Sequence, residues 1–203
     1  MPAKKRCPIC GSEDVSTESP SEYLYEHSGL SNVVLVGPGI VRITHCENCG
    51  QEMTVVRDEQ QLLQAIGLGL LQQEPGMRGE ELRFLRSLFE MTQAELADAM
   101  GLPRRETVAE WEAKSRIFAR PRDEITPRLI LLNLFRTQVI ESAYCALRTP
   151  QIELYESLVE SFVEHAGAML HKPTKRPARS GFNVRLKQRR TWSPDLPGSP
   201  LST

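Results

Sequence analysis

Four of the five cysteines occur in two copies of one short motif that is typical of metal sites. The motifs read CPICG, with Cys7 and Cys10, and CENCG, with Cys46 and Cys49. Two residues separate the thiols in each copy, so one tight turn can present both sulfurs to a single cation. The glycine that follows can adopt positive φ and let backbone amides approach the sulfurs. Two such turns supply the four thiolates of a tetrahedral Zn²⁺ site. The sequence therefore predicts structural zinc.

Two other uses of these cysteines remain open. A pair of disulfides would suit an exported protein, but no long apolar segment follows the basic start MPAKKR. A thioredoxin-like redox site would use one Cys-x-x-Cys motif near a βαβ pattern. Zinc held by four thiolates has no position for a catalytic water, so we expect no enzymatic activity. His45, next to Cys46, is a less favoured ligand, and Cys145 lies in an apolar stretch that predicts a core position.

The elements that must position these cysteines are short strands. The 35 residues between Cys10 and Cys46 contain the runs YLYEHS, NVVLVG and IVRITHC, which are β-branched or aromatic and separated by glycines. Residues 1–56 are therefore predicted to form a zinc-binding β domain. Such a domain is too small to hold a core without the metal.

Helical patterns dominate the rest of the chain. We predict a helix and linker at 57–78, a helical domain with a long following helix at 79–147, and a C-terminal helix at 148–171. The long following helix is expected from Asp123 to about Leu147, with Pro127 in its first turn. The predicted fold class is α+β, with a small zinc-binding β domain followed by a mainly α domain with extra C-terminal helices.

Charge is distributed unevenly along the chain. Residues 172–203 contain eight Lys or Arg and one Asp, a net charge of +7, whereas the whole chain has a net charge of −1, which leaves −8 for residues 1–171. The same segment is rich in Pro, Gly and Ser, so we predict a disordered basic tail. It is either a solvated tail or an arm that binds phosphates without sequence preference. No apolar run approaches the roughly 20 residues that span a bilayer, and a cytoplasmic location without membrane association is expected.

The segment TQAELADAMGLPRRETVAEWE predicts two short helices joined by a tight turn. Thr92 and Glu95 have the spacing of a capping box at the start of the first helix. Gly101 is suited to end that helix in the left-handed conformation, and Pro103 to the first turn of the next. Leu96 and Val108 are expected to face the core.

This segment resembles the Cro/C1-type (XRE) helix-turn-helix domain. The resemblance implies that the second helix of the pair enters the major groove of double-stranded DNA. It also implies a structural salt bridge for Glu112. The residues that carry the resemblance are Leu82, Leu85, Arg86, Thr92, Gln93, Leu96, Ala97, Gly101, Thr107, Val108, Trp111 and Glu112.

Together with the two Cys-x-x-Cys motifs, the chain is similar to the MqsA family of antitoxins, which carry a YgiT-type zinc finger. The resemblance spans about residues 7–135. It implies a zinc domain that neutralises a toxin protein in some members and a helix-turn-helix domain that dimerises and represses the family's own promoters. The long helices and the basic tail are additional to the usual antitoxin.

The candidate DNA contacts are local, although the whole chain is slightly acidic. Gln93 is expected to contact a phosphate, and Arg104 and Arg105 to reach guanine or phosphate from the start of the second helix. Lys114 and Arg116 follow that helix and are expected along the backbone. The full candidate set is Gln93, Arg104, Arg105, Glu106, Thr107, Glu110, Lys114 and Arg116.

Two functions therefore compete. The first is a dimeric, sequence-specific transcriptional regulator, an autorepressor that also serves as the antitoxin if a cognate toxin exists. In the second, the chain is a protein-interaction adaptor with structural zinc, in which the helix pair is only a scaffold. Binding of DNA beyond the charge of the tail distinguishes the two.

Overall fold

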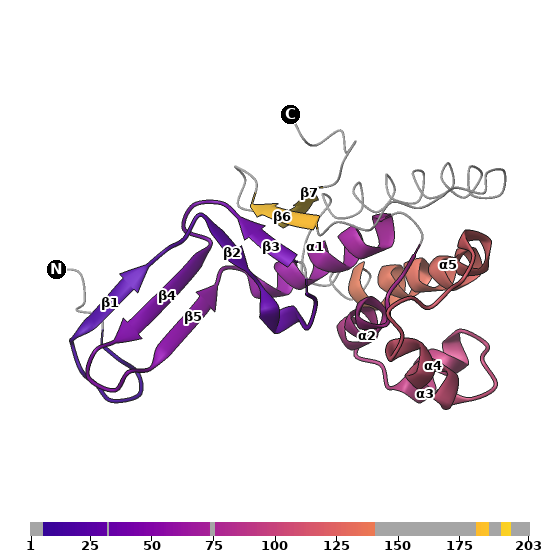
Figure 1. Ribbon diagram of the computed structural model, residues 1–203, viewed down its shortest axis with the longest axis horizontal. Coiled ribbons are helices and arrows are strands. Elements are labelled where there is room, and N and C mark those ends of the chain that lie inside the picture. The colour runs from indigo at the N-terminus through magenta and orange to yellow at the C-terminus, as the bar shows by residue number, and fades with distance from the viewer. Residues whose placement is uncertain (1–5, 32, 74–75, 141–181, 187–191, 196–203) are drawn as a thin grey trace.

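The structure is a computed structural model that describes residues 6–31, 33–73, 76–140, 182–186 and 192–195. A small antiparallel sheet near the N-terminus is followed by helices (Figure 1). The prediction of an α+β fold with this order of elements is confirmed. No helix in these ranges is long and apolar enough to cross a membrane.

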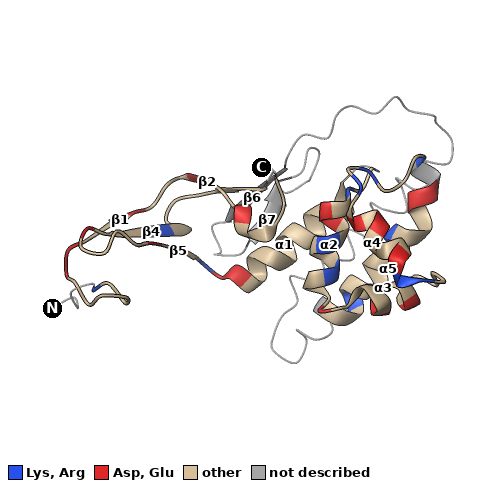
Figure 2. Cartoon of the chain, turned by 60° about the horizontal axis from the view of Figure 1, so that its bottom comes forward, with Lys and Arg blue, Asp and Glu red and all other residues tan. Residues whose placement is uncertain are grey.

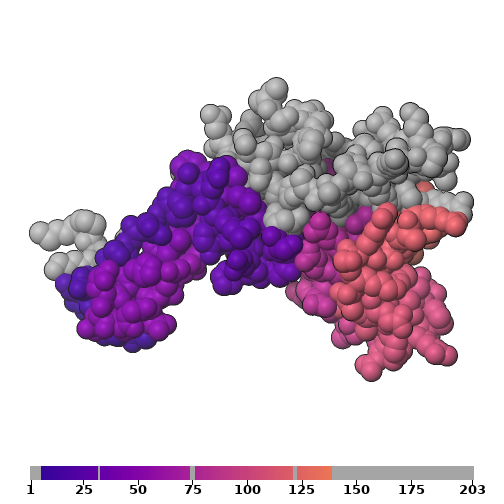
Figure 3. All heavy atoms as spheres, viewed as in Figure 1, coloured from indigo at the N-terminus to yellow at the C-terminus, as the bar shows by residue number. Residues whose placement is uncertain are grey.

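The first sheet contains β1 (Val15–Glu18), β4 (Val41–Cys46) and β5 (Glu52–Val56), in the order β1-β4-β5. Both pairings are antiparallel, and Cys46, the last residue of β4, lies opposite Val15. The second cysteine motif is therefore the turn between β4 and β5. In the space-filling view this sheet projects from the rest of the molecule (Figure 3). Val41 and Ile43 of β4 nevertheless belong to the core cluster that continues into the helices.

The second sheet is mixed and joins distant parts of the sequence. It contains β2 (Glu22–Leu24), β3 (Val33–Val36), β6 (Phe182–Leu186) and β7 (Trp192–Asp195), in the order β2-β3-β6-β7. A 3₁₀ turn, η1 (Glu26–Ser28), lies between β2 and β3. β3 pairs antiparallel with β2 and parallel with β6, whereas β6 and β7 pair antiparallel. The C-terminal segment thus completes a sheet begun near the N-terminus.

The prediction that residues 172–203 form a disordered tail is wrong for 182–186 and 192–195. The average composition of the tail hid the alternating sequence FNVRL, which has the two-residue period of a strand. The backbone hydrogen bonds of this strand go to β3, and a partner so distant cannot be identified from the tail alone. The predicted helix at 148–171 and Cys145 lie outside the described residues.

The helices begin directly after the sheets. They are α1 (Glu59–Gln72), α2 (Gly79–Leu88), α3 (Gln93–Ala99), α4 (Arg105–Glu112) and α5 (Ile125–Leu134). A 3₁₀ turn, η2 (Pro121–Glu124), precedes α5, and a π-helical segment, η3 (Phe135–Ile140), follows it. The single long helix expected from Asp123 is therefore three kinds of helix in succession, and its expected end lies outside the described residues.

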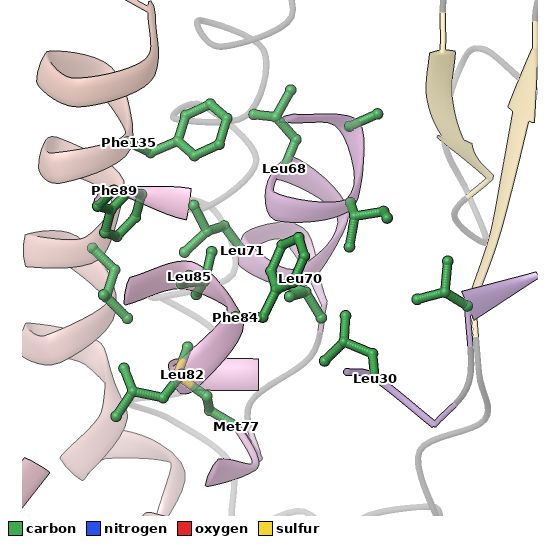
Figure 4. Packing of buried hydrophobic residues seen from close by; sticks show 14 of the residues in the cluster. Leu30, Leu68, Leu70, Leu71, Met77, Leu82, Phe84, Leu85, Phe89 and Phe135 are labelled. Carbon is green, nitrogen blue, oxygen red and sulfur yellow. The ribbon is translucent and has the colours of Figure 1, made fainter. Parts of the chain in front are cut away.

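Helix α1 connects the sheets to the helices through one continuous core. Leu62 and Ile66 are fully buried, and the same cluster of buried side chains extends to Leu35 in β3 and Phe135 after α5. Figure 4 shows side chains of α1 and α2 meeting Phe135 of η3 in this core. A Cβ atom at Gly67 would lie 2.5 Å from Leu88 Cδ2, so the glycine permits close packing of α1 on α2. The core crosses residue 56, the predicted domain boundary.

A buried ion pair fastens the link between α1 and α2 to α5. Glu124 and Arg128 are each 1% exposed and bind one another. Arg128 also donates to the carbonyl oxygens of Leu71, at 3.0 Å, and Gln73, at the end of α1. Glu124 accepts from the backbone N–H of Gly76 at 2.6 Å. The pair therefore satisfies backbone groups that the end of α1 leaves without helical partners.

Candidate metal centre and nucleic-acid interface

The four cysteines of the two motifs meet at the outer end of the first sheet. All four sulfurs lie within 4.8 Å of one another. Cys7 Sγ is 3.7 Å from Cys49 Sγ, and Cys10 Sγ is 3.5 Å from Cys46 Sγ. Four sulfurs around one ion with bonds of about 2.3 Å would be separated by about 3.8 Å, so the cluster has the size of a four-thiolate metal site. These residues can hold one metal ion, and the site is compatible with structural zinc.

The two cysteine turns have the same backbone geometry. Gly11 N–H donates to Cys7 O and Gly50 N–H donates to Cys46 O, both at 2.8 Å. Both glycines are left-handed, with φ of 74° and 66°. Each turn thus directs its two sulfurs to the same point, as the sequence motif predicts.

Hydrogen bonds favour the charged thiolate at Cys7 and Cys10, whereas at Cys49 a backbone hydrogen bond from Gln51, which lowers the pKa, is outweighed by burial and the neighbouring sulfurs, which raise the pKa to about 12. The backbone N–H of Ser12 and the side-chain amide of Asn48, at 3.6 Å, lower the pKa of Cys10 to about 6. Backbone amides of Cys10 and Ile9 also lower the pKa of Cys7. Thiolates are the form that binds a metal. Asn48 was not a candidate from the sequence, since it occupies a variable position of its motif. His45 pairs with Glu52 at 2.8 Å and is not in the cysteine cluster.

Helices α3 and α4 are joined by five residues, 100–104, and pack against one another. The capping box is confirmed: Thr92 N–H donates to Glu95 at 2.7 Å, and Glu95 N–H donates to Thr92 Oγ1 at 3.2 Å. Gly101 has φ of 64°, as expected for the residue that ends the helix. Leu96 and Val108 are fully buried. The tight connection and buried residues fix the relative position of the two helices.

A buried carboxylate at the end of α4 binds α2 and α3 together. Glu112 accepts hydrogen bonds from Arg86 Nε at 2.6 Å and from the Gln93 amide at 2.9 Å. Arg86 also donates to the carbonyl of Met91 at 2.9 Å. Burial alone would raise the pKa of Glu112, but the hydrogen bonds from Arg86 and Gln93 outweigh it and lower the pKa. The structural salt bridge expected for Glu112 is present, and Gln93 has a structural partner that the sequence did not indicate.

Most of the candidate DNA contacts lie on the surface. Glu106, Glu110, Lys114 and Arg116 are exposed, Thr107 is half-buried, and Arg104 and Arg105 are exposed where α4 begins. Arg105 pairs with Glu106 at 3.2 Å. Basic and acidic residues, blue and red in Figure 2, are interspersed along these helices. The arginines at the start of α4 are therefore available to an anionic ligand, although one of them has an acidic neighbour.

We expect Glu112→Gln to lower the free energy of unfolding of the helical part by about 2 kcal/mol. The carboxylate accepts a hydrogen bond from Arg86 at each oxygen, whereas the neutral amide of Gln has one acceptor oxygen and no negative charge. Urea unfolding followed by circular dichroism measures this loss. Since folding lowers the pKa of Glu112, its contribution is fully present above the ordinary carboxyl pKa of about 4.3 and is lost as the pH falls from there through the lower pKa of the folded state.

The matched control is Glu110→Gln, which changes an exposed residue of the same helix. It should leave the free energy of unfolding within about 0.5 kcal/mol of that of the wild type. Equal effects of the two changes near pH 7 would contradict the assigned role of Glu112.

No protein-family model, characterised protein or solved structure matches this chain.

Proposed function

We propose that the chain is a sequence-specific DNA-binding transcriptional regulator with a structural Zn²⁺ site, and that α3 and α4 are its helix-turn-helix. The single observation that carries the proposal is the position of Arg104 and Arg105. Both are exposed at the start of α4, where a recognition helix contacts base edges. The resemblance of the TQAELA and TVAEWE segments to Cro/C1-type domains supports the same assignment.

The rigidity of the helix pair supports this proposal further. A recognition helix must be held at a fixed angle for its side chains to discriminate bases. Glu112 ties the C-terminal end of α4 to Arg86 and Gln93, and Gly79 fits against the backbone of Glu112 so closely that a Cβ there would lie 2.4 Å from the carbonyl oxygen. Both ends of α4 are thus defined, one by the tight turn and the other by this network.

The acidic residues of α4 are compatible with DNA binding. Glu106 or Glu110 can accept a hydrogen bond from the amino group of cytosine, and Lys114 and Arg116 lie beyond the helix, where the DNA backbone would pass. A homodimer that binds two half-sites one helical turn apart follows from the proposed helix-turn-helix. The resemblance to MqsA favours the role of an autorepressor. The chain would also be an antitoxin if a toxin gene adjoins its own gene.

The zinc proposal rests on the donor set. Four thiolates at mutual distances that suit tetrahedral coordination favour zinc over hard cations, which prefer oxygen ligands. Cys7, Cys10, Cys46 and Cys49 would hold it, and with all four positions filled it stabilises the turns and supplies no catalysis.

Arg104→Ala and Arg105→Ala test the DNA assignment. Each is expected to weaken binding to the specific site by about 1–3 kcal/mol, and at least one should relax base preference at one position. Gel-shift titration against a set of single-base variants of the site measures both effects.

The matched control is Arg42→Ala, which removes the same charge from an exposed residue of β4 in the first sheet. It should leave the affinity unchanged within twofold. Loss of affinity that is equal for Arg42→Ala and Arg104→Ala would mean that only net charge matters, and the adaptor function would then be preferred.

A further inference from the structure

We propose that Asn48 is a positioning residue that holds the Cys10 thiolate on the metal and thereby limits the rate at which the site exchanges its ion. The inference rests on the metal site of the proposed function. Its starting point is the hydrogen bond that the Asn48 side-chain amide donates to Cys10 Sγ at 3.6 Å. This bond joins the second cysteine turn to the first, so it acts across the cluster.

The two cysteine turns are related by an approximate two-fold arrangement. Exchange of the turns takes Cys7 to Cys46 and Cys10 to Cys49. It therefore interchanges two close sulfur contacts, Cys10 to Cys46 at 3.5 Å and Cys7 to Cys49 at 3.7 Å. The backbone hydrogen bonds that close the two turns, both at 2.8 Å, are interchanged in the same way. The four ligands alone would thus form two equivalent halves.

The donor side chain breaks this equivalence. Asn48 precedes Cys49 in the second turn, and the equivalent residue of the first turn is Ile9, which precedes Cys10. The side chain of Ile9 has no hydrogen-bond donor. Within the described residues, Cys10 therefore receives a side-chain hydrogen bond from outside the cluster, and its counterpart Cys49 receives none.

The ligand that Asn48 contacts is also the one most open to competing ligands. Cys10 is exposed, whereas Cys7 and Cys46 are buried and Cys49 is half-buried. A chelator replaces the thiolates one at a time, and it meets the exposed one first, because burial restricts access to the others. A hydrogen bond that fixes the Cys10 thiolate should therefore slow the first step of metal release.

The expected size of the effect follows from the exposure of the bond. Partners of metal ligands change metal affinity by about 10–100-fold when they are removed. Asn48 is exposed, and water weakens its hydrogen bond, so we expect about tenfold, the lower end of this range.

Asn48→Ile tests the proposal, because the first turn already has isoleucine at the equivalent position of the same backbone geometry. Transfer of Zn²⁺ from the full chain to the chelator 4-(2-pyridylazo)resorcinol should be about tenfold faster than in the wild type. In a parallel experiment, N-ethylmaleimide should label Cys10 before the other ligands. In the Co²⁺-loaded chain, the sulfur-to-metal charge-transfer band should move to lower energy, because the amide no longer stabilises the sulfur lone pairs. A merely structural role of Asn48 would leave this band in place.

Two further variants serve as controls. Glu47→Gln changes the neighbouring exposed residue and should leave the transfer rate unchanged. The double variant Asn48→Ile with Ile9→Asn moves the amide to the equivalent position of the first turn, where it faces Cys49, so it should release Zn²⁺ as fast as Asn48→Ile alone.

Equal transfer rates for the wild type and Asn48→Ile, or a double variant as slow as the wild type, would overturn the proposal while leaving the metal site intact. A wild-type chain that binds no Zn²⁺ would overturn the metal site as well. The bound metal of the wild type, measured before the transfer begins, therefore distinguishes the two failures.

Discussion

Replacing Cys46 by Ser is expected to release the metal and unfold the β1-β4-β5 sheet. Cys46 is buried, ends β4 and lies 3.5 Å from Cys10 Sγ, so its loss removes a ligand and opens the cluster. Structural zinc in small domains contributes an apparent 10–16 kcal/mol near pH 7, far more than three short strands gain by themselves. The bound metal, measured by atomic emission, should fall from one ion per chain to less than about a tenth of that.

The unfolding should stop at the second sheet. Val33, Leu35 and Tyr25 belong to the core that continues into α1, and Tyr25 donates a hydrogen bond to Glu59 at 2.6 Å. Hydrogen exchange should therefore become fast in β1 and in the parts of β4 and β5 near the cysteines, and remain slow in β3, α1 and the end of β4 at Val41. Cys145→Ser is the control and should retain the metal. If Cys46→Ser keeps both the metal and slow exchange in β4, the four-cysteine site is wrong.

Arg128→Met is expected to lower the free energy of unfolding by about 3–5 kcal/mol, because it leaves a buried carboxylate without its cation. Two carbonyl oxygens at the end of α1, those of Leu71 and Gln73, also lose their donor. For a chain of this size the loss corresponds to a decrease in Tm of about 10 °C. Thermal unfolding of the metal-loaded protein measures it.

Two further variants separate the ion pair from the loss of side-chain volume. Arg120→Met removes an exposed arginine and should change Tm by less than about 2 °C. In the double variant Glu124→Gln with Arg128→Met no charge remains unpaired, so it should be more stable than the sum of the two single changes predicts. Additive effects would show that Glu124 and Arg128 do not act as a pair.

The sequence predicted correctly those features that depend on residues close together in the chain. The cysteine turns and the Thr92–Glu95 capping box are each defined by a few adjacent residues, and the structure contains all of them. β1 and β5 were not predicted as separate strands. VSTE is mainly exposed and has no apolar periodicity, and it becomes a strand by pairing with β4.

Sequence patterns did not predict interactions between residues that are far apart in the chain. The Glu124–Arg128 pair satisfies backbone groups more than 45 residues earlier in the chain, and nothing in its local sequence indicates them. β6 was missed for the same reason, because its partner β3 lies near the other end of the chain. The role of Gln93 likewise depends on Glu112, which lies 19 residues away. The DNA contacts and the bounds of the domains stay predictions.

Because β6 and β7 lie within the basic segment 172–203, its role in DNA binding cannot be tested by deletion. Deleting residues 172–203 would remove β6 and β7 as well as the charge. Substitution with Gln of the basic residues outside the strands neutralises the tail and retains both strands; these are Lys172, Lys175, Arg176, Arg179, Lys187, Arg189 and Arg190. This variant separates sequence-specific binding by α4 from binding by net charge.

The most direct measurement is the affinity of the wild type and this neutral-tail variant for the DNA just upstream of the chain's own reading frame, relative to random DNA, across a salt series. A helix-turn-helix that reads bases predicts that both proteins prefer the upstream DNA, with a shallower salt dependence for the variant. Binding by the wild type alone, without preference and with a steep salt dependence, would contradict the proposed regulator and assign the affinity to the tail.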